Sequence, residues 1–250
     1  MCSSDLDDPV AFQRLATDAG WGDGLPLIPP TDERVRAHVA ASGRFPDEVI
    51  GEIPPRNGRA TVEKLAVNAV MAGAPAEAMP LIIAAVEAML DPAFNLFALN
   101  TTTCCVVPGV FVNGPVRHVL GVPMGAGCYG GEAGPGASIG RATRLVMRNI
   151  GGQRVGETSK SVFGQPGRVS GICVAEWEER SPWMPLAARR GVIGDAVTVH
   201  GSTGTIDIAD TVADNGADLV EVIGKSLAFP GTNAFIGGHH GAEIMVAIAP

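Results

Sequence analysis

Apolar side chains recur at helical spacing in several stretches of the chain. Between residues 61 and 71 they repeat every three or four positions behind Thr61, whose hydroxyl suits the cap of a first turn. Residues 77–90 are apolar on almost every side, which is typical of a central, buried helix. The same reasoning predicts further helices over 9–18, from the cap Thr31 to about Ser42, from Pro115, over 138–150 behind the cap Ser138, and over 217–227.

Shorter apolar runs between turn residues predict strands. They fall at residues 95–102, 105–112, 169–177, 196–199 and 205–208, with a last one from Glu243. Residues 22–30 must be extended, because the residue before each proline avoids the helical region. The alternation of helices and strands predicts one main α/β domain, in which helix 77–90 packs on a mixed sheet that includes the strands flanking Cys104.

The chain is expected to consist of three parts. Residues 1–6 read like a translated sequencing adapter and are expected to be an artefact. Residues 7–45 form a helical N-terminal arm, and residues 46–250 form the main α/β domain. Because a buried strand normally leads into a turn and a covering helix, we expect this domain to continue past Pro250.

Composition narrows the classes of partner. A net charge of −8 argues against a nucleic-acid binder, which needs a basic face to displace counterions from phosphates. The longest apolar run, residues 79–90, is interrupted by Pro80 and Glu87 and is too short to cross a membrane. Cysteines after residue 6 are too few and too irregularly spaced for a secreted disulfide framework, so we expect a reducing, cytoplasmic location.

The run from Asn100 to Cys105 is the first candidate for chemistry. It places polar side chains between two predicted apolar strands, where the thiolate of Cys104 or Cys105 suits nucleophilic or redox chemistry. Asn100 and Thr102 are then candidate binding residues beside the thiols. The alternative is that both cysteines are small, buried hydrophobic residues.

A glycine-rich loop precedes the predicted helix 138–150. Gly125, Gly127 and Gly130 match the spacing of a dinucleotide fingerprint, but no helix follows directly, so a Rossmann site is not favoured. We expect the loop to lead an anion to the N-terminus of the helix that Ser138 caps. Arg141, Arg144 and Arg148 share one face of that helix, which would either clamp a carboxylate or phosphate or be a solvated surface.

Ser138 also lies in a Gly-x-Ser-x-Gly pattern, residues 136–140. With Asp207 or Asp210 and His239 downstream, the order is that of an α/β-hydrolase triad. A nucleophile elbow needs a strand before the serine, and the glycines and Pro135 there cannot form one. An N-cap explains Ser138 with fewer assumptions.

The segment Gly237-Gly-His-His-Gly241 offers a histidine that titrates near neutral pH. Adjacent strand residues point to opposite faces, so His239 and His240 cannot easily share a metal, and we predict no metal site but take His239 as the catalytic acid or base. Lys160 and Gln165, in the polar loop 156–167, and Asn113, after a predicted strand, complete the candidate binding residues.

Four segments resemble those of a bacterial family of UGSC-type (seleno)proteins, sometimes labelled thioredoxin-like. They are residues 22–31, 60–73, 112–115 and 164–167. The similarity extends over most of the chain from about Trp21, and it implies a cytosolic protein with thiol or selenol chemistry. This chain has no Cys-Gly-Ser-Cys, so no redox residue is carried over from the family.

The leading hypothesis is an enzyme that acts on a small organic molecule, with an anionic group, through a cysteine thiol. Under this hypothesis, we expect the segment that begins at Thr101 and the helix that Ser138 caps to enclose one shared cavity. The alternatives are a serine hydrolase that uses Ser138 and a non-enzymatic protein that binds a small molecule or a metal. The sequence indicates no particular cofactor, and a homo-oligomer remains compatible with it.

Overall fold

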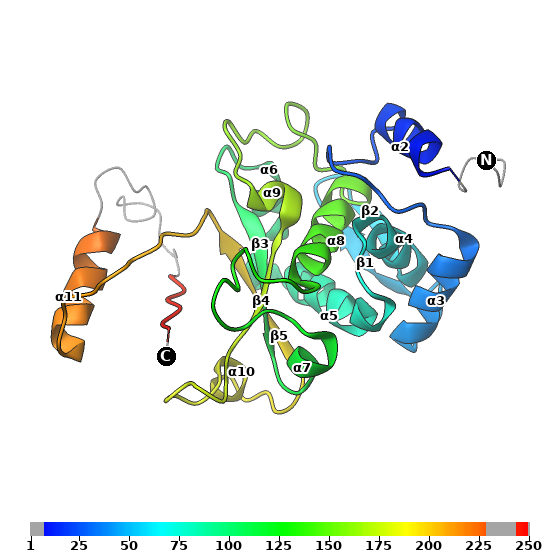
Figure 1. Ribbon diagram of the computed structural model, residues 1–250. Helices are drawn as coiled ribbons and strands as arrows, with labels where there is room; N and C mark the ends of the chain where they lie inside the picture. Colours follow the sequence, from blue (N-terminus) through cyan, green and yellow to red (C-terminus); the bar gives the residue numbers. More distant parts are fainter. Residues whose placement is uncertain (1–7, 229–243, 250) are drawn as a thin grey trace. The chain divides into compact units, whose positions relative to one another are not determined.

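The computed structural model describes residues 8–228 and 244–249, and the chain divides into two compact units, Met1–Gly204 and Thr205–Pro250. The first unit contains a three-stranded sheet in the order β4-β3-β5 (Figure 1). Its strands are β3 (Val107–Asn113), β4 (Ile172–Ala175) and β5 (Ala196–Ser202). β3 pairs in parallel with β4 and antiparallel with β5, so the sheet is mixed, and the predicted α/β class is confirmed.

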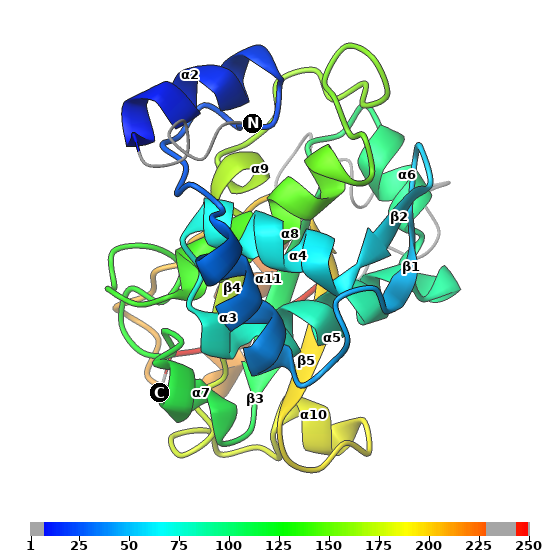
Figure 2. The ribbon, with the colours of Figure 1, turned by 90° about the vertical axis from the view of Figure 1, so that its right-hand side faces the viewer.

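Helices cover one face of this sheet in two layers. α5 (Met79–Leu90) contacts β5, and α8 (Gly136–Asn149) contacts β4 and β3. α3 (Asp32–Ser42) and α4 (Val62–Ala72) form the outer layer (Figure 2). The remaining elements of the unit are α2 (Pro9–Asp18), the strand pair β1 (Val49–Ile53) and β2 (Gly58–Thr61), η1 (Ala76–Ala78), η2 (Pro92–Phe94), α6 (Leu96–Thr101), α7 (Val116–Leu120), α9 (Gly167–Ser170) and α10 (Leu186–Arg189).

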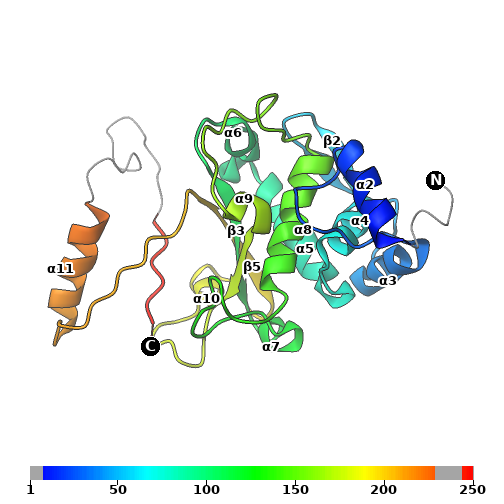
Figure 3. The same ribbon diagram turned by 45° about the horizontal axis from the view of Figure 1, so that its top comes forward.

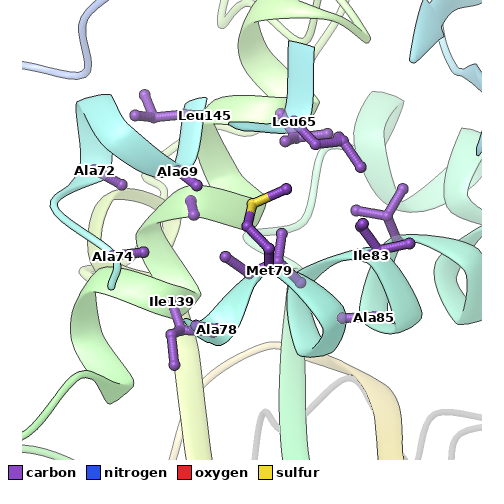
Figure 4. Packing of buried hydrophobic residues seen from close by; sticks show 14 of the residues in the cluster. Leu65, Ala69, Ala72, Ala74, Ala78, Met79, Ile83, Ala85, Ile139 and Leu145 are labelled. Carbon is purple, nitrogen blue, oxygen red and sulfur yellow. The ribbon is translucent and has the colours of Figure 1, made fainter. Parts of the chain in front are cut away.

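The core lies between the sheet and the two helix layers. α5 is buried on almost every side, as its apolar sequence predicts, and Met79 is fully buried among side chains of α4 and α8 (Figure 4). Leu65 of α4 and Leu145 of α8 are also fully buried. Burying one side chain of this size stabilises the fold by about 1.5–3 kcal/mol, so the α4, α5 and α8 interface is a major source of stability.

Several sequence predictions of helices are confirmed. Thr31 and Thr61 accept hydrogen bonds from the backbone of the first turns of α3 and α4, and each helix ends at a glycine in the left-handed conformation. α2 spans the predicted residues, and α7 follows Pro115. In the second unit, α11 (Gly216–Leu227) agrees with the predicted helix 217–227.

Other predictions of local structure are wrong. Residues 96–101 form helix α6 rather than a strand, because the Asn95 side chain caps its first turn and a run this short carries no decisive periodicity. α8 begins at Gly136 after Pro135, so Ser138 lies inside the first turn and is not its cap. Strands were expected at 205–208 and from Glu243, but residues 205–208 and 244–249 form no strand.

The predicted strand over 169–177 is shortened to β4, because α9 takes the residues before it. The hairpin of β1 and β2 was not predicted, since its short strands do not alternate clearly between buried and exposed positions. Residues 22–30, predicted to be extended, form neither helix nor strand. They join the body through a hydrogen bond of 3.2 Å from the amide of Ile28 to the carbonyl of Met71.

Among the described residues, no single helix is long and apolar enough to span a bilayer. Ala76–Leu90 and Pro92–Thr101 together have sufficient length and apolar composition, but the chain bends by 72° between them.

Candidate functional site

Two segments that are far apart in the sequence, residues 100–106 and 153–168, lie side by side at one end of the sheet. The amides of Lys160 and Val162 donate to the carbonyls of Thr101 and Thr103, each at 3.2 Å. α6 and α9 border this region, whereas α7 and α10 lie at the opposite end of the sheet (Figure 3). The structure therefore gathers the predicted residues of the two segments into one neighbourhood.

Gln165 connects these segments to the sheet. Its side-chain amide donates to the carbonyl of Cys105 at 2.8 Å and to that of Ser202, at the end of β5, at 3.0 Å. Lys160 takes part through its backbone, while its exposed ammonium group donates to the carbonyl of Glu157 at 3.0 Å. Gln165 is thus a residue that orders the backbone beside the thiol.

Asn100 is fully buried and lies at the inner side of this neighbourhood. Its Nδ2 donates to the carbonyl of Pro54 at 2.8 Å, and its own carbonyl accepts from Nε2 of Gln153 at 3.2 Å. The oxygen Oε1 of Gln153 in turn accepts from Nη2 of Arg144. A continuous chain of hydrogen bonds therefore links the end of α6 to α8.

Arg144 is buried on α8 without a carboxylate partner among the described residues. Its Nε donates to the carbonyl of Arg168 at 3.2 Å, but its Nη1 is buried and has no partner. Burial lowers the pKa of Arg144 to about 9, and the nearby charges of Arg168 and Arg148 act in the same direction. At neutral pH the guanidinium is still charged, and leaving such a charge uncompensated is costly.

Arg168, on α9, brings a second guanidinium to the same place. Its Nη1 donates to the carbonyl of Val106 at 3.3 Å, and its Nη2 donates to Oγ of the fully buried Ser159 at 2.9 Å. Burial lowers the pKa of Arg168, while attraction to Cys105 opposes this shift. Two residues beyond Ser159, the hydroxyl of Ser161 is buried and has no partner. We name Arg144, Gln153, Ser159, Ser161 and Arg168 the arginine cluster.

Cys105 lies next to this cluster and is partly exposed. Its Sγ donates to the carbonyl of Thr203 at 3.1 Å. Cys128 and Cys173 are poorly suited to form a thiolate, because burial raises the pKa of Cys173 to about 12 and also raises that of Cys128. Cys105 is partly exposed and interacts with the guanidinium of Arg168, so it is the better-placed nucleophile.

Its neighbour Cys104 is partly exposed, and its amide donates to Oγ1 of Thr102 at 3.1 Å. Thr102 follows the last residue of α6 and turns the chain toward β3. The predicted group of Asn100, Thr102 and the two cysteines is therefore one continuous bend of the backbone.

The N-terminal part of α8 serves another contact. Arg141 forms an ion pair of 2.7 Å with the carboxylate of Asp23 and donates to the carbonyl of Pro26 at 2.9 Å, which fixes the N-terminal arm. Ser138 donates from Oγ to the carbonyl of Pro135 at 2.9 Å. Arg141 and Arg144 are both buried, so the predicted arginine stripe is not a solvated surface.

The predicted glycine-rich loop lies at the other end of the sheet. Gly125 is close to the ring of Trp177, which follows β4, whereas Cys105 precedes β3. Because β3 and β4 are parallel, the segment before one strand and the segment after the other lie at opposite ends of the sheet. Gly125 and Gly127 therefore do not join Cys105 in one cavity, and the glycine loop and the thiol form separate regions.

Asn113, the last residue of β3, lies at the same end of the sheet as the glycine-rich loop. Its Nδ2 donates to Glu176 and Glu178, each at 2.8 Å. The buried Arg117 pairs with Glu178 at 3.0 Å and with Glu179 at 2.9 Å. Hydrogen bonds from Arg117 and His118 lower the pKa of Glu179 to about 2. Asn113 and Arg117 thus pair with these glutamates, while Oδ1 of Asn113 is buried without a partner. In the part of the chain that the structure describes, no set of three metal ligands gathers.

The predicted members of a serine triad divide between the units, with Ser138 in the first and Asp207 and Asp210 in the second. Residues 130–135 before Ser138 form turns and a loop, not the strand of a nucleophile elbow. Asp210 accepts hydrogen bonds from the amides of Val212 and Ala213 within the second unit. His239, the predicted acid or base, lies outside the described residues.

Sequence reasoning did not single out Arg168, Gln153, Ser159 or Ser161. Arg144 carried a usable signal, because a charged residue inside the apolar pattern of α8 requires a special partner. Gln153, Ser159 and Ser161 lie outside helices and strands, and Arg168 lies on the four-residue helix α9. In such segments no periodicity separates a buried side chain from an exposed one. Comparisons with models of known families, with curated proteins and with solved structures found no match.

Proposed function

We propose that this protein is an enzyme that acts on a small organic anion through the thiol of Cys105. The arginine cluster holds the anionic group of the substrate, and the Cys105 thiolate attacks an electrophilic carbon next to it. The observation that carries the proposal is the buried Nη1 of Arg144, which has no partner in a cluster of cations that lacks a carboxylate among the described residues.

An anionic ligand would compensate this charge. A carboxylate or phosphate oxygen accepts charge-assisted hydrogen bonds from guanidinium groups, and Arg is the usual residue for planar, bidentate recognition of such groups. The guanidinium of Arg168 also interacts with Cys105, so the anionic group would be held beside the nucleophile.

The neighbouring residues have separate roles in this proposal. Gln165 holds the carbonyl of Cys105, and Gln153 holds Arg144. His239 remains the proposed acid or base that takes the thiol proton and returns it to the leaving group. A nucleophilic thiol needs reducing conditions, so we propose the cytoplasm as its location, which agrees with the thiol chemistry implied by the resemblance to UGSC-type proteins.

The test is alkylation of the native protein by iodoacetamide, followed site by site with mass spectrometry. We expect Cys105 to react faster than Cys128 and Cys173, and inorganic phosphate or malonate to slow its reaction severalfold. Arg168→Gln is expected to slow the basal reaction of Cys105 and to remove the protection by anions. Lys160→Gln, which removes an exposed charge, is the matched control.

Two results would contradict the proposal. One is a Cys105 that reacts no faster than the buried Cys173. The other is equal protection by anions in Arg168→Gln and in the native protein. A rise of the melting temperature with phosphate, together with an unreactive Cys105, would instead favour a binding protein without turnover, which the orphaned Arg144 by itself also supports.

A further inference from the structure

A cavity of about 440 Å³ lies in the first unit, and its wall includes neither Cys105 nor any residue of the arginine cluster. Trp21 and Pro30 of the N-terminal arm form one side of it, and Lys64, Val67 and Met71 of α4 form another. The end of α8 completes the wall. Its volume is within the range of about 300–1,000 Å³ that is usual for small-molecule sites.

Most of the wall is apolar. Met71 is buried, and Trp21 is half-buried and packs against the core. The amide of Trp21 donates to the carbonyl of Ala16 at 2.8 Å, and Arg141 fixes the arm a few residues further on. A cavity with an indole and a thioether on fixed backbone suits a flat, apolar molecule.

Two asparagines supply a polar strip whose orientation is determined. Nδ2 of Asn68 donates to the carbonyl of Lys64 at 2.8 Å, so Oδ1 of Asn68 must be the atom that accepts from Nδ2 of Asn149, also at 2.8 Å. This order leaves Oδ1 of Asn149 as an acceptor, and it is buried without a donor. The strip therefore favours a ligand that brings a hydroxyl or N–H group.

The charges around the cavity are positive. Lys64 is exposed at the wall, and its ammonium donates to the carbonyl of Arg59 at 2.8 Å. Beside Trp21, Arg154 donates to the carbonyl of Gly20 at 2.8 Å, and no carboxylate belongs to the described wall. Asp23, two residues beyond Trp21 on the arm, is paired with Arg141.

From these contacts we infer that the cavity between the arm and α4 is a second binding site, which takes a planar aromatic carboxylate that carries a hydrogen-bond donor. Trp21 and Met71 contact the ring, Lys64 attracts the carboxylate, and the asparagine strip accepts from the donor. This site is independent of the arginine cluster and of Cys105.

The test is isothermal titration of the whole protein with 6-hydroxynaphthalene-2-carboxylate, and with its neutral carboxamide for comparison. We expect the carboxylate to bind severalfold more tightly than the amide. Lys64→Gln should weaken binding of the carboxylate by about three- to fivefold, as expected for one partly exposed charge, and leave the amide unchanged. Lys160→Gln, a lysine outside the cavity wall, should change neither.

A second variant, Val67→Trp, fills the cavity and should abolish binding, and its thermal unfolding verifies that it folds. Should Val67→Trp fail to fold, Trp21→Ala takes its place, with at least a tenfold loss of affinity expected. Cys105→Ser and Arg168→Gln should bind as the native protein does, so that failure of this site is distinguishable from failure of the proposed enzyme. The inference is overturned if neither compound binds, if amide and carboxylate bind equally, or if the filled cavity still binds.

Discussion

The side chain that departs most from ordinary protein chemistry is Arg144. A buried cation normally has an acidic partner, because removing a charge from water costs several kcal/mol, but Arg144 has hydrogen bonds only to a carbonyl and to Gln153. Its pKa of about 9 means that this cost is present at neutral pH and decreases only as the pH rises above that value. An anion that binds here removes part of the cost.

This argument predicts the behaviour of Arg144→Met. In the native protein, phosphate at about 100 times its dissociation constant should raise the free energy of unfolding by about 2.7 kcal/mol, because it binds only the folded state. The variant has no guanidinium to compensate, so its melting temperature should not change with phosphate. Arg141→Met is the matched control, since that guanidinium is already paired with Asp23.

Thermal unfolding at constant ionic strength, with chloride as the replacement salt, measures this difference. An equal rise of melting temperature in the native protein and in Arg144→Met would show that phosphate acts elsewhere.

The ion pair of Asp23 and Arg141 predicts a dependence on pH. Burial raises the pKa of Asp23, but hydrogen bonds from Arg141 and Leu25 and the charge of Arg141 outweigh this and lower it below 3.8. A carboxyl group whose pKa is lowered in the folded state stabilises the protein above its unfolded value and loses this contribution as the pH falls through the folded value. The arm should therefore detach from α8 below about pH 4.

Hydrogen exchange of the amide of Leu27, measured between pH 3 and pH 6, follows this detachment. Asp23→Asn should exchange faster at pH 6 and show a weaker change of protection with pH than the native chain, after correction for intrinsic exchange. A native-like profile in Asp23→Asn would rule out the ion pair as the cause.

At the scale of elements, close packing of β2 on the end of α8 determines one glycine. A Cβ atom at Gly58 would lie 1.9 Å from the carbonyl oxygen of Ile150, so backbone must move to accept it. Gly58→Ala should lower the free energy of unfolding by about 1–3 kcal/mol, as overpacking does. Gly22→Ala, where the nearest atom is the Leu27 side chain at 3.5 Å, is the control and should change stability little.

Chemical denaturation by urea measures both variants. Equal midpoints for Gly58→Ala and Gly22→Ala would contradict the close approach of β2 and α8.

At the scale of the whole molecule, the core belongs to the first unit. Among residues 8–228 and 244–249, all the members of the buried cluster lie before Gly204, and α11 has no buried residue. A chain that ends at Gly204 should therefore keep a cooperative thermal transition, with a melting temperature within a few degrees of the full chain. Circular dichroism of the two chains tests this, and a loss of cooperative unfolding would mean that the second unit stabilises the first.

Local signals in the sequence were sufficient for much of the framework. The caps Thr31 and Thr61, the terminal glycines and the all-round apolar character of 79–90 predicted the helices, because these features act within a few residues of one another. The short run 96–101 was misassigned, since its helix depends on a cap at Asn95 that outweighs an ambiguous apolar pattern. The polar run around Cys105 and the candidates Gln165 and Arg144 were also visible in the sequence.

By itself, then, the sequence determined the α/β class, most helices and the residue types that suit thiol and anion chemistry, because spacing, capping and composition are local properties. Only the tertiary structure decided that Arg168 and Gln153 lie with Arg144 near Cys105, that Arg141 instead fixes the arm, and that the glycine loop lies at the far edge of the sheet. These relations join residues that are distant in the chain, and they follow from the direction of β3 and β4 and from the burial of α8. No local pattern encodes them.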